Sequence, residues 1–406
     1  MKFAHMADCH IGGWAEPKMR ALNIGAFARA VDICIEENVD FVLISGDLFN
    51  SSLPAMDPLK TTVHKLMELR KKNIPVYIIA GSHDFSPTGK TMIDVLCEAG
   101  LCINVVIGKV IEGKLNLRFT QDPVTGAKIT GMIGRRGMLE KSYYESLDTK
   151  SLEQEPGYKI FMFHTAIDEL KPKELEKMES SPISLLPKGF DYYAGGHVHI
   201  IRDIQLEGYK QVVYPGPLFP NNFRELEELG SGGFYIVKDD IIKYIPITLR
   251  RRHNIVIDCS GMTADNVRKE LIENIENSDI KEKIILIRLK GKMSNGRQAD
   301  IDFRSIFEMI YKRGAYFVMK NTSALNMTGL EEIKIKSGSA EEIEESLIKE
   351  HIGQISINGM DGPGEEQLAK SLLKSLDTDK KEGEKVHDFE ERITSELDKF
   401  LQISGK

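Results

Sequence analysis

The chain has 406 residues, of which 28% are charged and 41% hydrophobic, as in globular proteins that fold in water. At about 100–200 residues per domain, this length indicates two or three domains. The sequence lacks an apolar run of the roughly 20 residues that span a bilayer, and MKFAHMADCH (1–10) lacks the pattern of a signal peptide. These features argue against a membrane protein or an exported one, and we expect a cytoplasmic protein.

The net charge of −7 lies in the last part of the chain. Residues 336–406 hold 10 Lys and Arg and 17 Asp and Glu. The whole chain has 54 basic and 61 acidic residues, so the part before residue 336 holds 44 of each. The preceding part is therefore neutral. It permits a nucleic-acid partner, although no strongly basic stripe indicates one.

The five cysteines are odd in number and form no C-x-x-C pair; they are Cys9, Cys34, Cys97, Cys102 and Cys259. This pattern argues against a disulfide framework and against a cysteine zinc site. It indicates a protein that works in the reducing interior of a cell.

The first hundred residues alternate between apolar runs and helical patterns. The runs are KFAHMAD (2–8), VDFVLISGD (39–47) and PVYIIAG (75–81). Helices are predicted between and after them, over 20–37, 58–72 and 90–99. Their apolar faces hold Leu22, Phe27, Val31 and Cys34 in the first helix and Leu59, Val63, Leu66 and Met67 in the second. This alternation predicts a parallel βαβ sheet that is buried on both faces.

Further strands follow in the middle of the chain. A hairpin is predicted to turn at Thr125–Gly126, and strand patterns resume at KIFMFH (159–164), FDYYAGGH (190–197) and QVVYPGP (211–217). The stretch FYIVKDDIIKYIPI (234–247) predicts a second hairpin that turns near Asp239–Asp240.

The composition changes after RRRH (250–253). Residues 254–330 predict a small α+β unit with helices over 264–277 and 301–312, and GMDGPG (359–364) is typical of a linker. Two amphipathic helices follow, with apolar faces formed by Leu368, Leu372, Leu373 and Leu376, and by Val386, Phe389, Ile393, Leu397, Phe400 and Leu401. We therefore predict domains over 1–250 and 251–332, a linker over 333–364, and a helical module over 365–406.

Metal-ligand residue types follow five of the apolar runs, where each strand is predicted to end. They are Asp8 and His10, Asp47, His83 and Asp84, His164, and His197 and His199. Because the carboxyl ends of strands in an open α/β sheet share one edge, we expect these side chains to meet there. Gly46, Gly81, Gly195 and Gly196 precede them and allow the backbone to approach an ion closely.

This set of ligands suits two divalent metal ions. Two ions roughly 3.5–4 Å apart activate a water and neutralise a phosphate during in-line attack. Mixed carboxylate and imidazole ligands favour Mn, Fe or Zn over Mg or Ca. Each motif alone occurs by chance, and a lone histidine is more often structural. We give that structural interpretation to His5, His64, His253, His351 and His387.

The motifs DCH (8–10), GDLF (46–49), GSHD (81–84), FH (163–164) and GGHVH (195–199) resemble those of the calcineurin-like metallophosphoesterase superfamily. MKFAHMADCHIGG (1–13), GDLFNSS (46–52) and VVYPGP (212–217) are similar to the DNA double-strand-break repair nuclease family, in its archaeal type, which is related to the nuclease subunit of SbcCD. The resemblance implies an α/β fold, namely an αββα sandwich with a small α+β DNA-capping domain and C-terminal helices.

The resemblance also implies a role for each residue. Asp8, His10, Asp47 and His199 hold one metal, and Asp47 bridges to a second metal that His164 and His197 also bind. His83 contacts the scissile phosphate and helps to protonate the leaving oxygen, and Asp84 orients His83.

Two positions depart from the family pattern. Ser82 stands where the family has a metal-binding asparagine, so we expect it to act through a water and the second metal to bind more weakly. Asn50 stands where the family has a histidine, which puts the exonuclease mode in doubt more than the endonuclease mode.

Several basic residues are candidates for DNA phosphate contacts, with a solvated basic loop as the alternative; they are Arg135, Arg136, Arg250, Arg251, Arg252, Lys290, Lys292 and Arg297. The terminal helices either fold back onto the body or, as the resemblance implies, dock on the coiled-coil base of an SMC-like ABC ATPase. The helices over 58–72 and 90–99 either form a homodimer bundle or simply cover the sheet.

Together these features predict a Mn-dependent DNA exonuclease and endonuclease of double-strand-break repair, intracellular and associated with the nucleoid. Its substrates would be DNA ends, hairpins and single strands. One alternative is a general calcineurin-like phosphodiesterase or phosphatase. The other is a non-catalytic scaffold of the same fold.

Overall fold

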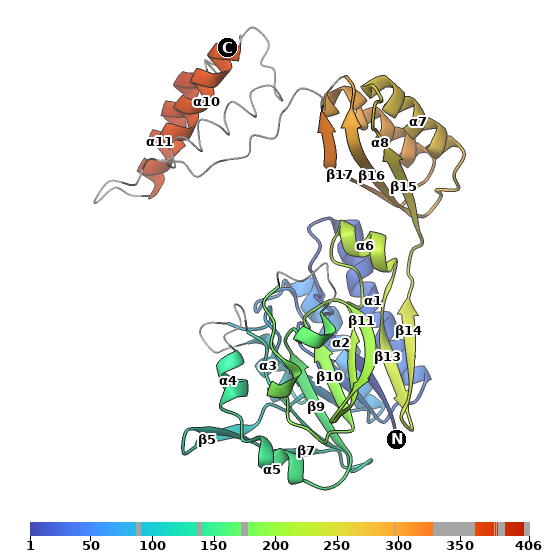
Figure 1. Cartoon of the computed structure of the whole chain (residues 1–406), viewed down its shortest axis with the longest axis vertical. Coiled ribbons are helices and arrows are strands. Elements are labelled where there is room, and N and C mark those ends of the chain that lie inside the picture. Colours follow the sequence, from blue (N-terminus) through green and yellow to red (C-terminus); the bar gives the residue numbers. More distant parts are fainter. Residues whose placement is uncertain are drawn as a thin grey trace. The chain divides into compact units, whose positions relative to one another are not determined.

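The computed structural model describes residues 1–86, 91–135, 140–171, 178–295, 297–327, 362–376, 378, 380 and 386–401 (Figure 1). The chain divides into two compact units. One comprises Met1–Ile255, Asp279–Ile287 and Glu308–Asn321, and the other Val256–Ser278, Arg288–Phe307 and Thr322–Lys406. Within these described ranges, no helix is long and apolar enough to cross a membrane.

The first of two six-stranded sheets has the order β14-β13-β1-β2-β3-β4. Its strands are β1 (Lys2–Met6), β2 (Phe41–Ser45), β3 (Val76–Ile79), β4 (Ile103–Asn104), β13 (Gly232–Lys238) and β14 (Ile241–Ile247). The strands β1 to β4 run parallel, and β13 and β14 form the predicted antiparallel hairpin. The helices α1 (Pro17–Glu36), α2 (Met56–Lys71) and α3 (Met92–Glu98) connect the parallel strands.

The second sheet has the order β11-β12-β10-β9-β8-β7. Its strands are β7 (Thr120–Gln121), β8 (Lys128–Gly131), β9 (Lys159–His164), β10 (Tyr192–Gly196), β11 (Ile201–Leu206) and β12 (Tyr209–Pro215). The strands β8, β9, β10 and β12 run parallel, and β7 and β8 form the other predicted hairpin. The remaining elements of this part are β5 (Gly108–Ile111), β6 (Lys114–Leu117), α4 (Lys141–Glu145), α5 (Thr149–Gln154) and α6 (Phe223–Leu229).

The two sheets pack face to face. Successive side chains of a strand point to opposite faces. Phe41 and Leu43 of β2 therefore lie in a core that also holds Ile160 and Met162 of β9. The alternate residues face outward, where Val42 and Ile44 join a core with α1 and α2, and Phe161 and Phe163 join one with α4 and α5. This confirms the predicted αββα sandwich.

The predicted apolar face of α2 is wrong at one position. Leu66 is 1% exposed and Leu69 is also buried, but Met67 is 42% exposed. Leu66 and Leu69 are three residues apart, so they share the side of the helix that faces the sheet, whereas Met67 is rotated away from it.

Residues 252–327 contain a three-stranded sheet in the order β15-β16-β17, formed by β15 (Arg252–Asp258), β16 (Ile284–Met293) and β17 (Phe317–Met327). Its helices are α7 (Ala264–Glu276) and α8 (Phe303–Lys312). The α7 helix begins at Thr263, whose hydroxyl accepts the backbone N–H of Asn266. It buries Val267, Leu271 and Ile275 at the spacing of one helix face.

Two terminal helices, α10 (Gly362–Leu376) and α11 (Val386–Leu401), contact each other. The α10 helix begins inside the predicted linker motif GMDGPG. The rest of the predicted linker, residues 333–361, lies outside the described residues.

We expect Leu66→Ala to lower the free energy of unfolding by about 2–5 kcal/mol, because it leaves a cavity beneath α2. The neighbouring Met67→Ala should change it by less than about 0.5 kcal/mol, because Met67 is 42% exposed and points away from the sheet. Urea unfolding followed by circular dichroism measures both values. Equal losses in the two variants would contradict the observed orientation of α2.

Candidate metal centre

The candidate ligands follow strands of both sheets. Asp8 and His10 follow β1 and Asp47 follows β2 in the first sheet, whereas His164 ends β9 and His197 follows β10 in the second. The expectation of a single sheet edge is therefore corrected. Because the sheets stack face to face, the carboxyl ends of their strands lie next to each other, and the ligands gather across both edges.

Five candidate ligands have a left-handed backbone that non-glycine residues rarely adopt. The φ angles are 49° at Asp8, 41° at His10, 52° at Asp47, 96° at His197 and 54° at His199. Such a conformation costs on the order of 1–3 kcal/mol per residue and persists where surrounding contacts impose it. It turns each side chain sharply at the end of its strand, which is the geometry that a shared site requires.

The ligand atoms fall into three overlapping groups whose members lie within 4.8 Å of one another: Asp8, His10 and His199; Asp8, Asp47 and His164; and His10, Asp47 and His83. Asp47 Oδ2 lies 3.1 Å from His164 Nε2 and 3.7 Å from His10 Nε2. Asp47 thus reaches ligands from both sheets, as a bridging carboxylate must. His83 is close enough to be a ligand itself, although the resemblance assigns it another role.

His197 occupies a different position in this geometry. Its backbone N–H donates to both oxygens of Asp8, at 3.0 and 3.1 Å, and its ring lies 5.1 Å from the ring of His164. It lies beside His164 but belongs to none of the three groups found among the described residues. Its assignment as a ligand stays a prediction.

Two buried nitrogens support a bound cation. Within the described part of the chain, His10 Nδ1 is buried and has no hydrogen-bond partner, and the buried His164 Nε2 has only the Asp47 carboxylate beside it, at 3.1 Å. A buried polar atom without a partner costs about 1–3 kcal/mol, and coordination of an ion removes that cost. The Nε2 atoms of His10 and His199 also lie only 2.9 Å apart. The donor set therefore fits a divalent ion.

Electrostatics favours a positive charge at the same point. Burial opposes a charge on the His164 ring, but the carboxylates of Asp47 and Asp8 raise the pKa of His164 to about 10. Burial lowers the pKa of His10 to about 3 and that of His197 to about 3, so both rings stay neutral. The carboxylates thus attract a cation, and the neutral rings of His10 and His197 are free to bind it.

Two glycines allow this crowding. Gly46 has a φ of 85°, and a Cβ there would overlap the His164 ring. A Cβ on Gly81 would overlap the Asp47 carboxylate. We expected Gly195 to let the backbone approach an ion, but a Cβ there would instead meet the rings of Phe163 and Tyr214.

Hydrogen bonds to the far side of two imidazoles set their orientation. His164 Nδ1 bonds to the Ser45 carbonyl at 2.8 Å, which leaves Nε2 facing the cluster. His199 Nδ1 bonds to Glu225 Oε1 at 3.0 Å. The Glu225 carboxylate also accepts from Asn221 N at 2.8 Å and from Asn222 Nδ2 at 2.6 Å.

Glu225 was not among the residues expected at the site. The only sequence signal is the pair Asn222 and Glu225, spaced as a helix N-cap and its third residue. The Asn222 side chain accepts from Glu225 N at 2.9 Å, as this spacing predicts. The spacing indicates where α6 begins, but it does not indicate that Glu225 bonds to His199.

The expected role of Asp84 is corrected. Its carboxylate accepts backbone N–H groups from Leu48 at 3.2 Å, Phe49 at 3.0 Å and Gly81 at 3.1 Å, and so joins the loops after β2 and β3. The His83 ring is oriented instead by the Asn50 carbonyl, 2.9 Å from Nδ1. The backbone N–H groups of Leu48 and Phe49 are buried after the end of β2 and need an acceptor. The Asp84 carboxylate supplies it, and this explains why the carboxylate bonds to the backbone rather than to His83.

Ser82 lies next to the proposed bridging residue. Its hydroxyl donates to Asp47 Oδ2 at 3.4 Å, and the side chain is 6% exposed. The hydroxyl thus contacts a ligand. Its own part in metal binding stays a prediction.

His5 confirms its structural interpretation. The ring is fully buried, with Nδ1 3.0 Å from the Tyr192 hydroxyl and Nε2 3.0 Å from Ser45 Oγ. Burial lowers the pKa of His5 to about 3, so the ring is neutral.

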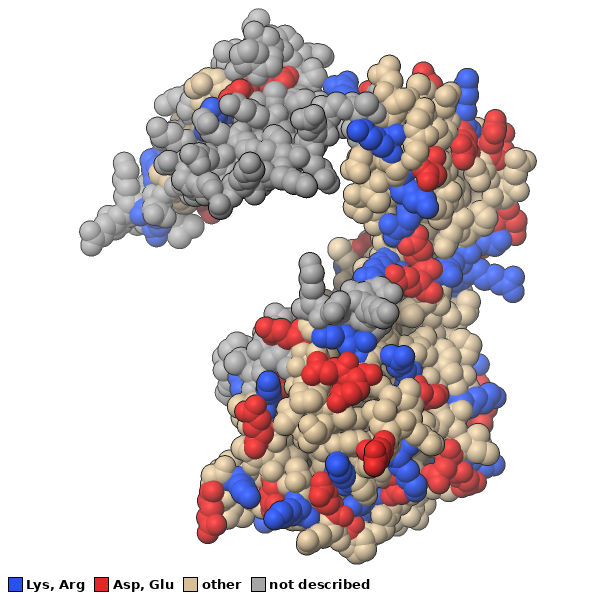
Figure 2. Space-filling view, viewed as in Figure 1, with Lys and Arg blue, Asp and Glu red and all other residues tan. Residues whose placement is uncertain are grey.

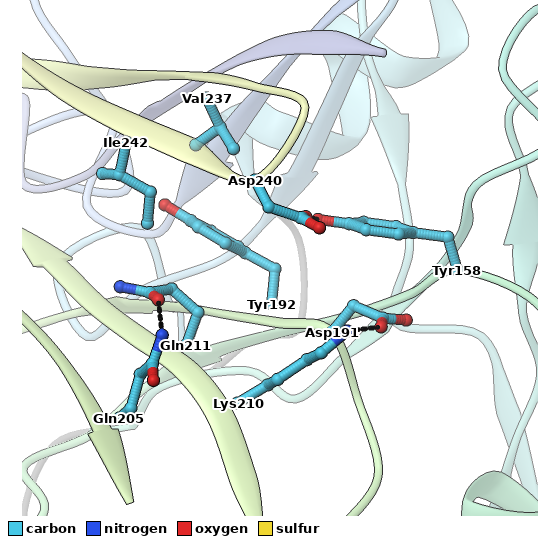
Figure 3. A pocket seen from close by; sticks show the side chains of 9 residues that line it. All are labelled: Tyr158, Asp191, Tyr192, Gln205, Lys210, Gln211, Val237, Asp240 and Ile242. Atoms are coloured by element: carbon cyan, nitrogen blue, oxygen red, sulfur yellow. Dashed lines mark hydrogen bonds and ion pairs between the residues drawn. The ribbon is translucent and has the colours of Figure 1, made fainter.

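Tyr192 also lines a cavity at the amino ends of β9 and β10, shown with Lys210, Asp191 and Asp240 in Figure 3. At about 80 Å³ this cavity has room for a few waters but not for a nucleotide.

Some of the predicted DNA-contact residues have protein partners. Arg252 Nη1 donates to the carbonyls of Leu226 at 2.6 Å and Glu227 at 2.7 Å, at the end of α6. Arg135 lies over the Phe85 ring at 4.5 Å, and its Nη1 donates to the Tyr143 hydroxyl at 2.7 Å.

The remaining basic candidates are on the surface. Arg250 pairs with Glu282 at 3.0 Å, and exposed side chains belong to Arg251, Lys290, Lys292 and Arg297. Arg136 lies outside the described residues. On the face shown in Figure 2, described acidic and basic side chains are interspersed, without a continuous basic stripe.

Comparisons with known proteins agree with this geometry. Residues 1–200 match the calcineurin-like phosphoesterase family. The chain is 27% identical over 368 residues to the DNA double-strand break repair protein Mre11 of Archaeoglobus fulgidus, covering 84% of this chain and 77% of that protein. It is 25% identical over 358 residues to the protein of the same name from Methanococcus maripaludis, covering 82% of this chain and 89% of the relative.

Among solved structures, a dimetal phosphatase from Danio rerio aligns with 61% of this chain and 95% of its own. The sequence identity is 11% and the TM-score is 0.39, too low to carry an argument.

We expect Glu225→Ala to weaken metal binding by about 10–100-fold, because His199 loses the carboxylate that orients it. Glu225→Gln keeps an acceptor oxygen and should retain more of the affinity. Titration calorimetry with Mn²⁺ measures both. The control is Glu228→Ala on the same helix, where Glu228 pairs with Arg224 on the surface. An unchanged affinity in Glu225→Ala would show that His199 does not depend on this contact.

Proposed function

Because this chain belongs to the calcineurin-like metallophosphoesterase superfamily, and within it to the archaeal type of DNA double-strand-break repair nuclease, we propose that it cleaves DNA with two Mn²⁺ ions. It is a metal-dependent DNA repair nuclease. The observation that carries the proposal is the convergence of Asp8, Asp47 and several imidazoles from two sheets on one point.

The ions, when bound, activate a water and neutralise the phosphate in an in-line attack. We assign Asp8, His10, Asp47 and His199 to one ion, and Asp47, His164 and His197 to the other. Mixed carboxylate and imidazole donors support Mn²⁺ as the physiological choice. The Ser45 carbonyl and Glu225 hold His164 and His199 in the orientation that binding requires.

We assign proton transfer to the leaving oxygen to His83. With Nδ1–H donating to the Asn50 carbonyl, Nε2 of the neutral ring carries a lone pair. The ring therefore donates a proton from Nε2 only in its protonated form. The backbone N–H of His83 donates to Asp47 Oδ1 at 2.7 Å, which keeps this loop against the proposed bridging ligand.

Two further interactions belong to the proposal. Large apolar side chains on α2 and α3 are exposed, with Met67 at 42% and Val95 at 57%, which supports a homodimer interface there. On α10, Leu376 is 59% exposed, which supports docking of residues 365–406 on an SMC-like ABC ATPase. We also propose the domain limits 1–250, 251–332, 333–364 and 365–406, which rest on the composition of the sequence and on the family resemblance.

The main rival is a general phosphodiesterase or phosphatase with the same metals. It predicts that a small chromogenic phosphodiester is cleaved at least as well as DNA. The second rival, a non-catalytic scaffold, conflicts with the intact set of carboxylates and imidazoles.

With Mn²⁺, the wild-type protein should cleave blunt, hairpin and single-stranded DNA. His83→Ala should lose about 10²–10⁴-fold in rate, as expected when a general acid is removed. His253→Ala is the matched control, because His253 lies on β15 and belongs to none of the groups of candidate ligands found among the described residues. No Mn²⁺-dependent cleavage by the wild type would favour the scaffold.

Ser82→Asn should strengthen binding of the second Mn²⁺, because an amide carbonyl is a better neutral ligand than a serine hydroxyl already bonded to Asp47. Metal titration of the two proteins measures the difference. Equal affinities for both ions would refute a role for Ser82 in weakening the second site.

Asn50→His should raise the ratio of exonuclease to endonuclease activity, because an imidazolium adds a positive charge beside the DNA phosphate. The backbone carbonyl that orients His83 is kept in this variant. End-labelled linear DNA and circular single-stranded DNA, assayed side by side, give the ratio. An unchanged ratio would rule out this explanation.

A further inference from the structure

Two of the five cysteines meet in the folded protein. Cys97 lies in the last turn of α3 and Cys102 directly precedes β4, and their Sγ atoms are 3.2 Å apart. The sequence spacing C-x-x-x-x-C gave no reason to pair them. The other three cysteines are buried at separate positions, namely Cys9, Cys34 and Cys259.

The turn between the two cysteines is well defined. Leu101 N bonds to the Leu96 carbonyl at 3.0 Å, and Gly100 N bonds to the Cys97 carbonyl at 2.8 Å. These two bonds, with Gly100 at a φ of 68°, form the Schellman motif that ends many helices. Leu96 and Leu101 are both buried, as the motif requires.

Arg70 holds the turn from outside, through a bond from its Nη1 to the Ala99 carbonyl at 3.2 Å. The sulfur atoms are therefore brought together by a backbone that has little freedom to separate them. A disulfide has an S–S distance of about 2.05 Å, so the sulfurs need to approach by only about 1.2 Å. Side-chain rotation can supply a movement of this size.

The two thiols differ in access. Cys97 is partly exposed, whereas Cys102 is 5% exposed. The hydrogen bond from the Cys102 thiol lowers the pKa of Cys97 and raises that of Cys102. A thiolate that solvent can reach, next to a second thiol, is the arrangement found in cysteines that react with oxidants.

We propose that Cys97 and Cys102 form a dithiol that hydrogen peroxide converts reversibly to a disulfide. The Cys97 thiolate attacks a peroxide oxygen, so that an S–O bond forms, the O–O bond breaks and hydroxide leaves. The Cys102 sulfur then attacks the Cys97 sulfur, and the S–S bond replaces the S–O bond. The second oxygen leaves as water with the proton of Cys102. Two thiols are oxidised, and the peroxide is reduced to water.

The disulfide would join the end of α3 to the edge of the first sheet. The β4 strand pairs with β3 through Tyr77 and Ile103 and through Ile78 and Asn104. The β3 strand leads directly to Ser82 and His83. Oxidation therefore places a covalent constraint next to the strand that carries the proposed proton donor, at a position outside the metal ligands.

The test treats the reduced full chain with graded hydrogen peroxide, then unfolds it in an alkylating reagent and counts the alkylated thiols. We expect the five free thiols to fall to three, because two are consumed. Cleavage after Glu98, which lies between the two cysteines, should yield two peptides linked by a disulfide and lighter by two hydrogen atoms. Dithiothreitol should restore all five thiols.

The variants separate this reaction from general oxidation. Cys102→Ser should leave Cys97 as a sulfenic acid that dimedone traps, and Cys97→Ser should form no disulfide. Cys259→Ser should still form the Cys97–Cys102 bond. The proposal is overturned if the wild type keeps five thiols, if it links two chains, or if Cys97 reaches the sulfinic acid while Cys102 stays reduced.

Discussion

Two buried carboxylates set the main constraint on this protein. Asp8 and Asp47 are each at most 2% exposed, and a buried charge without a partner is costly. The fold answers by surrounding them with imidazoles and with backbone N–H groups such as that of His197. The left-handed backbone at both residues is part of the same cost. A cation at this point would offset it, which supports the proposal of a metal centre rather than a structural ion pair.

The packing of the two sheets is what brings imidazoles to the two carboxylates. A single sheet edge supplies Asp8, His10 and Asp47, but His164 and the residues after β10 come from the opposite sheet. Packing through the core of Phe41, Leu43, Ile160 and Met162 holds the two edges together. Hydrophobic burial between the sheets therefore sets the distances on which the proposed chemistry depends.

The contacts that orient the histidines of the candidate site differ in kind. His164 and His83 are oriented by backbone carbonyls, whereas His199 is oriented by the carboxylate of Glu225. A backbone carbonyl remains when the side chain of its residue is substituted. The carboxylate of Glu225 is part of the side chain, so a single substitution removes it. The proposed binding of an ion at His199 would thus be more sensitive to mutation than the proposed binding at His164.

The sequence alone determined the strands, the layers and the candidate ligand residues at the strand ends, because apolar periodicity and residue type are local properties. Only the tertiary structure decided that Asn50 orients His83, that Glu225 bonds to His199, and that Cys97 meets Cys102. The first depends on a backbone carbonyl, which any residue type supplies. The second joins residues 26 positions apart, and the third depends on the geometry of a turn. Such contacts leave no periodic or compositional signal, so folding has to bring them together before they can be recognised.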